Sequence, residues 1–298
     1  MTHSIFLMTF NQHGRCIPDA LNCIDKDYDI VIIGSQECCH SIQKSFFCSS
    51  KRIWKNSIEI KLKQFSDDYI HIHSKSLNAQ VLSIFIKQGI NLTCLQSKSL
   101  KLGKYGANKG VISTQFCIDH QPFHIVSCHL NSGEKVKNRL SQVKKLSKFI
   151  EAQANSDQEK IFILGDLNFR IELEEDKCNQ LIEQGQIFDI LQQDQIIKNN
   201  FVFYDIKEIL FNPTYKISDG NFSQGRTPSY TDRIMVYDVL GSDKYKTCQC
   251  KSKGQKFDGK FVVDKYDSYK VQGSDHWPVY GVILMVNQPM EGQKIFTK

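Results

Sequence analysis

Residues 111–129 read VISTQFCIDHQPFHIVSCH and contain two runs of β-branched and aromatic side chains, Val111–Ile118 and Phe123–Cys128. Runs of this length and composition are typical of buried strands. Only Asp119–Pro122 separates them, which is too short for a crossover helix. Two strands that follow each other directly argue against a sheet in which strands and helices simply alternate.

Similar runs recur along the chain, and helical periodicity is less common. Glu134–Ala154 carries apolar residues at helical spacing, and Asp176–Gln184 and Tyr204–Leu210 are shorter helix candidates. The strand pattern therefore predicts two packed sheets with helices outside. Without repeats or linkers, we expect one domain over residues 1–298. The other predicted strands are Ile5–Phe10, Asp29–Gly34, Val81–Lys87, Ile161–Leu164, Ile234–Val236 and Val279–Val286.

Composition and charge narrow the class of protein. The 298 residues are 41% hydrophobic and 23% charged, as in an ordinary globular protein, and the net charge is +6. A mild positive charge suits an acidic substrate or an anionic membrane surface, although a simple lysine excess explains it equally well. We expect the protein to be a monomer and to have no nucleic-acid partner.

The cysteine pattern and the apolar runs of the sequence help to predict the cellular compartment. The 11 cysteines show no repeating spacing, and we find no secretory signal or membrane-spanning run, so we expect reduced thiols in a cytoplasmic protein that contacts membranes transiently. No cysteine has an arginine six positions later, which excludes the cysteine-based phosphatase loop.

Polar residues gather where predicted strands end. Asn11 ends the first strand, Glu37 closely follows the second, and His129 ends the run at 123–128. Gly165–Arg170 follows the strand Ile161–Leu164, and Ser274-Asp275-His276 precedes the last strand. Strand ends converge on one rim of a sheet, which is where binding and catalytic sites are built.

These residue types suit the hydrolysis of a phosphate ester. Glu37 can offer a carboxylate to a hard divalent cation, and Asp166 or His276 could activate a water. Asp232 or Asp275 could orient a histidine. Donors for the charge that develops on phosphate are Asn11, His129, Asn168 and His276.

Two sequence blocks resemble signatures of the inositol polyphosphate 5-phosphatases, a family of DNase I-like metal-dependent phosphoesterases. Residues 165–171, GDLNFRI, are similar to G-D-L-N-[YF]-R, and residues 228–235, PSYTDRIM, are similar to P-[AS]-W-[CT]-D-R-[IV]-L. The resemblance covers about residues 3–287 and implies a two-sheet, four-layer α/β sandwich of the DNase I or endonuclease-exonuclease-phosphatase type. Further matches in family order are Asn11, Gln36-Glu37, Asn108-Lys109-Gly110, 127–130, 213–216 and 274–276.

The resemblance implies Mg²⁺-dependent removal of a 5-phosphate from phosphoinositides or soluble inositol polyphosphates. It implies that Glu37 binds the metal, with Asp275 near it. Asp166 matches the residue that orients or deprotonates the water, which leaves Asp166 and the His276–Asp232 pair both open as the base. The other implied catalytic positions are Asn11, His129, Asn168, Asp232 and His276.

The substrate positions are also carried over from the family. Tyr215, Lys216 and Arg226 match the group that binds the neighbouring 4-phosphate. Asn108 and Lys109 match contacts with the inositol ring and its other phosphates. Tyr230 departs from the usual tryptophan, which predicts altered packing, and Trp277 stands where a cation is frequent, which puts one contact in doubt.

Two rival functions are weighed against this one. A nuclease of the same superfamily would share the hydrolytic residues but would need a broad basic face in place of the 4-phosphate cluster. A catalytically silent phosphoinositide-binding module would lack a catalytic position, and none is missing.

Several charged residues have plainer interpretations. Lys98 and Lys101 are expected in a solvated loop, and Arg139 on the surface of the long helix. Arg170 and Arg233, inside the signatures, are expected to pair with carboxylates.

Overall fold

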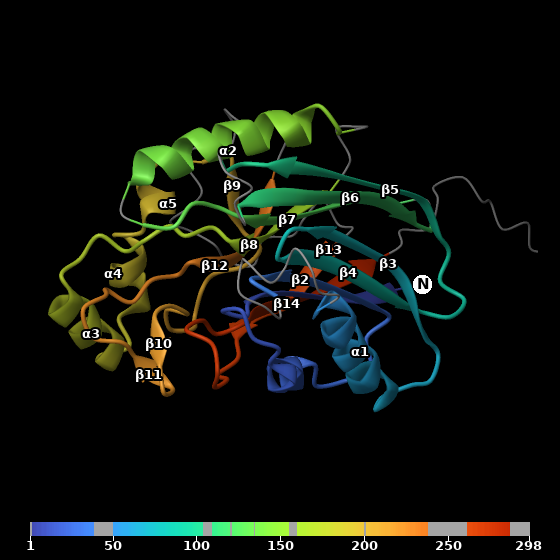
Figure 1. Ribbon diagram of the computed structural model, residues 1–298, viewed down its shortest axis with the longest axis horizontal. Coiled ribbons are helices and arrows are strands. Elements are labelled where there is room, and N and C mark those ends of the chain that lie inside the picture. Colours follow the sequence, from blue (N-terminus) through green and yellow to red (C-terminus); the bar gives the residue numbers. More distant parts are fainter. Residues whose placement is uncertain are drawn as a thin grey trace, which may run out of the picture.

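The computed structural model describes residues 2–38, 50–103, 109–119, 121–133, 135–154, 160–199, 201–237 and 261–286. Within these ranges the chain forms two six-stranded sheets and one small hairpin (Figure 1). The two longest helices lie on the outer faces of the two sheets. The predicted two-sheet α/β sandwich is therefore confirmed.

The first sheet has the strand order β13-β14-β1-β2-β4-β3. Its strands are β1 (Thr2–Asn11), β2 (Ile30–Gln36), β3 (Tyr69–Leu77), β4 (Gln80–Lys87), β13 (Phe261–Ser268) and β14 (Val279–Val286).

The second sheet has the order β5-β6-β7-β8-β12-β9. Its strands are β5 (Leu92–Lys101), β6 (Gly110–Ile118), β7 (Gln121–His129), β8 (Lys160–Asp166), β9 (Phe203–Asp205) and β12 (Asp232–Tyr237). The separate hairpin consists of β10 (Ile217–Ser218) and β11 (Asn221–Phe222).

Helices complete the outer layers. The helix α2 (Val136–Glu151) covers the second sheet, at the top of Figure 1, whereas α1 (Ser50–Lys63) and the 3-10 helix η1 (Pro18–Cys23) cover the first, at the bottom. The shorter helices are α3 (Glu175–Glu183), α4 (Ile187–Leu191) and α5 (Gln195–Lys198). None of the helices in the described part of the chain is long and apolar enough to cross a membrane.

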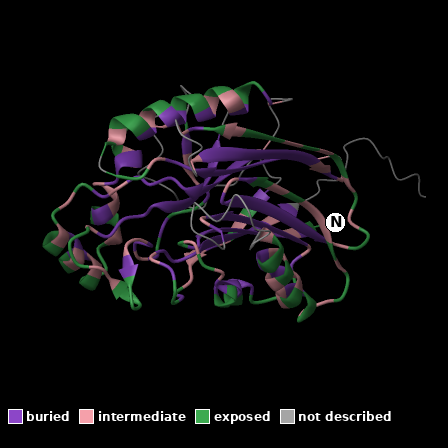
Figure 2. Cartoon of the chain, in the orientation of Figure 1, coloured by how far each residue is buried: buried purple, intermediate pink, exposed green. Residues whose placement is uncertain are grey.

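Side-chain alternation along the strands explains the four layers. In β1, Ile5 and Leu7 face the core between the sheets, whereas Phe6 and Met8 face the layer that contains α1. The second sheet does the same, so that Ile163 packs beneath α2. Because successive side chains point to opposite faces, continuous apolar strands bury both faces of a sheet (Figure 2).

Strand direction brings the polar residues to one rim. The strands β1 and β2 are parallel, with Asn11 opposite Gln36, and β7 and β8 are parallel, with His129 opposite Asp166. The antiparallel strand β12 begins at this rim, because Asp232 lies opposite Asp166.

One predicted helix is wrong. The segment Tyr204–Leu210 begins within the edge strand β9, where Tyr204 pairs with Val236 and the buried Phe203 packs beside Met235. The free edge of β12 supplies backbone partners that outweigh the weak local helical spacing. Lys98 and Lys101 likewise lie on β5, an edge strand, and not in a loop.

Candidate active site

The turn after β8 sets the position of two candidate residues. Gly165 lies at φ +158°, and a side chain there would place its Cβ about 1.9 Å from the carbonyl oxygen of Cys128. Asn168 takes the left-handed conformation at φ +57°, and Glu37 does so at +48° after β2. Left-handed non-glycine residues are uncommon and gather at functional sites.

Asp166 is the centre of the cluster and is 1% exposed. Its Oδ2 accepts a hydrogen bond from Asn11 Nδ2 at 3.0 Å and lies 3.2 Å from His129 Nε2, while its Oδ1 accepts from the backbone N–H of Asn168. Burial alone would raise the pKa of Asp166, but the His129 hydrogen bond and the nearby cations of His276 and Lys109 hold it well below its usual range.

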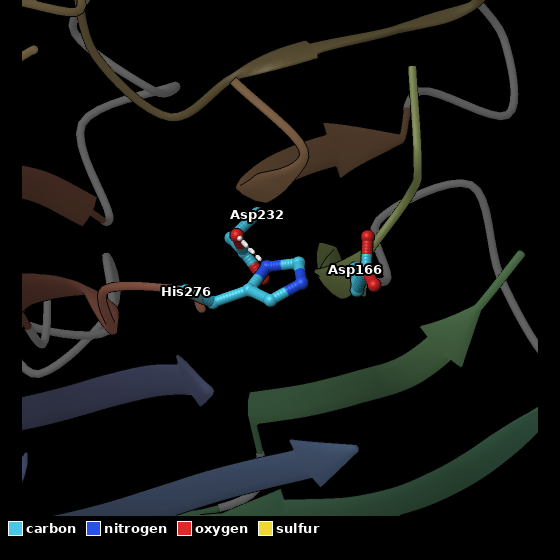
Figure 3. Close-up of side chains that lie close together, drawn as sticks. All are labelled: Asp166, Asp232 and His276. Carbon is cyan, nitrogen blue, oxygen red and sulfur yellow. Dashed lines mark hydrogen bonds and ion pairs between the residues drawn. The ribbon is translucent and has the colours of Figure 1, made fainter. Parts of the chain in front are cut away.

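His276 and Asp232 form a buried pair beside Asp166 (Figure 3). His276 Nδ1 lies 2.8 Å from Asp232 Oδ2, and the other ring nitrogen faces Asp166. Burial on its own would lower the pKa of His276, but the Asp232 carboxylate outweighs it, and the pKa rises to about 9. The imidazole is therefore a cation near neutral pH.

Lys109 and His129 form a second polar pair at the rim. The ammonium of Lys109 contacts His129 Nε2, which also lies 3.8 Å from Glu37 Oε1. Burial, aided by Lys109, lowers the pKa of His129, and burial also lowers the pKa of Lys109 despite the attraction of Asp166 and Glu37. The pair places an ammonium group and an imidazole ring at the rim.

Carboxylate oxygens suited to a hard cation lie at the same rim. The Glu37 side chain is 29% exposed, and that of Asp275 is 16% exposed with its Oδ1 3.1 Å from His13 Nδ1. Neither is paired with a lysine or arginine among the described residues. A carboxylate that remains partly open to water, as that of Glu37 does, fits Mg²⁺, which keeps several of its waters when bound.

A second group could hold a metal by distance alone. Asp166, Asp232 and His276 bring ligand atoms within 4.8 Å of one another. This set fits Mg²⁺ poorly, because a protonated imidazole has no lone pair to offer and Asp232 Oδ2 already accepts from three side chains.

The predicted substrate residues are brought together only in part. The centre of the Tyr215 ring lies 4.6 Å from the centre of the His276 ring. The guanidinium carbon of Arg170 lies 4.2 Å from the centre of the Tyr215 ring. Lys216 follows directly and is half-buried, whereas Arg226 is exposed beyond the β10–β11 hairpin. Asn108 lies outside the described residues.

The sequence interpretation missed some supporting residues. Thr214 and Thr231 each donate a hydrogen bond to Asp232 Oδ2 at 2.9 Å. Both threonines lie inside the motif blocks, and each directly precedes a candidate site residue. A hydroxyl beside a candidate residue was therefore the sequence signal that could have identified them. Ser274 was quoted only as part of a motif, yet its hydroxyl donates to the Asn11 carbonyl and so joins two ends of the rim.

Two interpretations of arginines need correction, and one is confirmed. Arg139 is fully buried, and its guanidinium donates to Gln195 Oε1 and to loop carbonyls. Arg170 donates to Asn168 Oδ1 and contacts the Tyr215 ring, with no carboxylate partner in the described ranges. Arg233 pairs with Asp194 at 2.7 Å and with Asp205, as expected.

The three residues that depart from the family pattern, Tyr230, Met235 and Trp277, are all buried. Tyr230 is 0% exposed and packs against Phe211. Trp277 packs against Phe222, with the Lys270 ammonium 5.3 Å from its ring centre.

Comparison with known proteins assigns the chain to a family. Residues 8–282 match the model of endonuclease/exonuclease/phosphatase family 2, so the chain belongs to that family. It is 28% identical over 286 residues to a probable inositol polyphosphate 5-phosphatase of Schizosaccharomyces pombe, covering 82% of this chain. It is 29% identical over 276 residues to a polyphosphatidylinositol phosphatase of Saccharomyces cerevisiae, covering 85%. The chain spans only 22% and 23% of the lengths of these relatives.

A solved structure shares the fold. The inositol polyphosphate 5-phosphatase domain of synaptojanin, crystallised with inositol (1,4)-bisphosphate and calcium, superposes with a TM-score of 0.76 at 22% identity. The match covers 96% of this chain and 84% of that domain.

Proposed function

We propose that this chain is a Mg²⁺-dependent phosphatase that removes the 5-phosphate from inositol phosphates, either as lipid headgroups or in soluble form. Candidate lipids are phosphatidylinositol 4,5-bisphosphate and phosphatidylinositol 3,4,5-trisphosphate. The observation that carries the proposal is the His276–Asp232 pair, whose other ring nitrogen, Nε2, faces Asp166 and lies 3.8 Å from Asp275 Oδ1, at a rim that also holds Lys109 and His129. Membership of a phosphatase-containing family and the names of the curated relatives support it.

Asp166 is the proposed partner of the attacking water. Its carboxylate is ionised and fixed on both oxygens, by Asn11 on one and by the Asn168 backbone on the other. Such a group can accept a hydrogen bond from water and hold it in one direction.

His276 is the proposed donor to the phosphate. Because Asp232 binds Nδ1, the ring presents Nε2 to the rim. His129, Asn11, Asn168 and Lys109 add further donors. Fixed donors aimed at the charge that develops on phosphate are worth about 10²–10³-fold in rate for each one removed.

Glu37, with Asp275 close by, would hold the metal. When bound, Mg²⁺ neutralises phosphate charge and polarises its oxygens. Glu37→Gln should lower turnover by at least about 10²-fold while the thermal midpoint without metal stays the same. Glu183→Gln, the same change on an exposed face of α3, is the matched control.

The test is a Mg²⁺ titration that follows both phosphate release and the thermal midpoint. Wild type and the Glu183 variant should gain stability with Mg²⁺, and Glu37→Gln should not. Retained turnover in Glu37→Gln with Mg²⁺ still required would move the metal elsewhere. Cleavage of duplex DNA in place of inositol phosphates would favour the nuclease.

Substrate choice is proposed to depend on the 4-phosphate. Tyr215, Lys216 and Arg226 would bind it, while Asn108 and Lys109 would contact the ring. A charge-assisted contact is worth roughly 1.5–3 kcal/mol. Lys216→Ala should therefore lower kcat/KM by roughly 10–150-fold, but only on substrates that carry the 4-phosphate. Equal losses on a matched pair with and without that group would contradict the assignment.

A further inference from the structure

A pocket of about 420 Å³ lies between the start of α1 and the adjoining ends of β3 and β4. Cations and hydroxyls line it, and no described lining residue is a carboxylate. Its lining residues are Lys51, Arg52, Lys55, Asn56, Ser74, Ser76 and Val81. This chemistry suits a phosphate group, and none of these side chains belongs to the catalytic cluster.

The pocket opens at the end of the first sheet that holds the catalytic rim. Val81 lies opposite Ser76 on one side and Ser35 on the other, and Ser35 comes two residues before Glu37. The backbone N–H of Cys38 donates to Ala79 O at 2.8 Å. The turn between β3 and β4, which joins two strands that line the pocket, is therefore hydrogen-bonded to the residue that follows the metal-binding candidate Glu37.

The solvent face of α1 continues from the pocket. Ile53 is 57% exposed and Ile60 is 65% exposed, and their seven-residue spacing puts them on one side of the helix. Trp54 and Ile58 occupy the opposite, buried side. Single exposed isoleucines are common, but two on one face beside cations match helices that lie on membranes.

The charge of α1 has a definite sign. Its sequence SKRIWKNSIEIKLK holds five basic residues and one acidic residue, Glu59, which pairs with Lys55 at 3.0 Å. Burial lowers the pKa of Lys51, so an anion close to it would replace hydration that this ammonium has lost. An anionic surface is the electrostatic complement of such a helix.

We propose that this pocket and the solvent face of α1 form a docking surface for an anionic lipid membrane, with a lipid phosphate in the pocket and Ile53 and Ile60 at the lipid boundary. The isoleucines favour lipid over a soluble anion, because they gain nothing from a small anion in water. The docked chain would present its catalytic rim close to the membrane. Only that last step rests on the proposed function.

The test is co-sedimentation with vesicles of phosphatidylcholine, with and without 30% phosphatidylserine, neither of which is the proposed substrate. The first variant is Arg52→Glu with Asn56→Glu, both exposed pocket residues. The matched control is Lys144→Glu with Ser141→Glu, which makes the same net-charge change on exposed positions of α2. The second variant, Ile53→Ser with Ile60→Ser, leaves charge unchanged.

Wild type should bind the phosphatidylserine vesicles and release them at high salt. Each cation near an anionic surface contributes roughly a fivefold change in partition, so the first variant should bind about 100-fold more weakly. The isoleucine variant should bind roughly tenfold more weakly, and the control should match wild type. All variants should hydrolyse soluble inositol 1,4,5-trisphosphate at the wild-type rate.

Three results would overturn the docking surface. The first is equal binding of wild type to neutral and anionic vesicles. The second is an equal loss of vesicle affinity in the α1 and α2 charge variants, which would show that only the net charge of the protein matters. The third concerns soluble inositol 1,4,5-trisphosphate, whose binding to Asp166→Asn is measured by calorimetry. If the pocket substitutions weaken that binding, the pocket belongs to a soluble ligand. Since the vesicles carry no phosphoinositide, a failure of the phosphatase proposal would leave the vesicle results unaffected.

Discussion

One carboxylate oxygen of Asp232 takes part in three side-chain hydrogen bonds at the rim. Its Oδ2 accepts from Thr214, Thr231 and His276 at 2.8–2.9 Å. The two hydroxyls fix the direction of the carboxylate, and the carboxylate in turn fixes the His276 ring. Precise orientation of a donor is worth more to a reaction than its mere presence. Under the proposed function, Thr214 would be a positioning residue that acts on the substrate through Asp232 and His276.

We predict that Thr214→Val lowers kcat by roughly 3–30-fold, because a hydrogen bond to a charged group contributes about 1.5–3 kcal/mol and part of it is retained by Thr231. KM should change little, and Thr214→Ser should restore kcat. Steady-state kinetics on a soluble substrate measures this. Thr227→Val, which removes a hydroxyl bond to the Leu173 carbonyl away from the cluster, is the control. Equal effects of the two valine variants would show that only packing is involved.

At the scale of elements, His124 joins β7 to its neighbours. Its Nε2 lies 2.7 Å from Ser113 Oγ on β6, and that hydroxyl donates to Gln153 Oε1, just beyond α2. The side chain is fully buried, and burial lowers the pKa of His124 to about 4. The folded protein therefore keeps this ring neutral in mildly acidic solution, where the unfolded chain protonates it.

The sign of the pH effect follows directly. Above pH 6.5 the ring is neutral in both states, and its contribution to stability is fully present. Between about pH 6.5 and 4 only the unfolded chain takes up the proton, so stability falls as pH falls, by up to about 3 kcal/mol. Urea unfolding of wild type and His124→Gln at several pH values should show a steeper loss in wild type. Parallel curves would mean that His124 is charged when folded.

Within the two large sheets, the strands that the sequence did not predict share one position in the fold. Every predicted strand is present, while the unpredicted β3, β5, β9 and β13 are the four edge strands of the two sheets. Edge strands expose one side and alternate polar with apolar residues, as β5 does with Lys98 and Lys101. Such lysines discourage pairing with another chain, but they also remove the apolar signal that reveals a central strand.

The candidate site, like the fold, could be predicted from the sequence only in part. Motif spacing indicated Asp166, His276 and Asp232, which the fold brings together. It gave no sign that Arg139 is buried, because its partner Gln195 lies 56 positions away in the sequence. Contacts between distant segments depend on packing, and no local pattern records them.

For the whole molecule, the important feature is that the site spans both sheets. Asn11 comes from the first sheet and donates to Asp166 of the second. The apolar core between the sheets, which includes Leu7 and Leu164, sets the distance between these two residues. Site geometry and global packing are therefore coupled, which explains why residues from β1 to β14 are needed for one small cluster.

The most direct test asks which phosphate leaves. Inositol 1,4,5-trisphosphate is incubated with the protein and Mg²⁺, and the product is identified by phosphorus NMR. We predict inositol 1,4-bisphosphate, with one phosphate released per substrate. We also expect the rate to fall by roughly 10²–10⁴-fold in Asp166→Asn. Loss of the 1- or 4-phosphate, or an Asp166→Asn rate within a few-fold of wild type, would contradict this prediction.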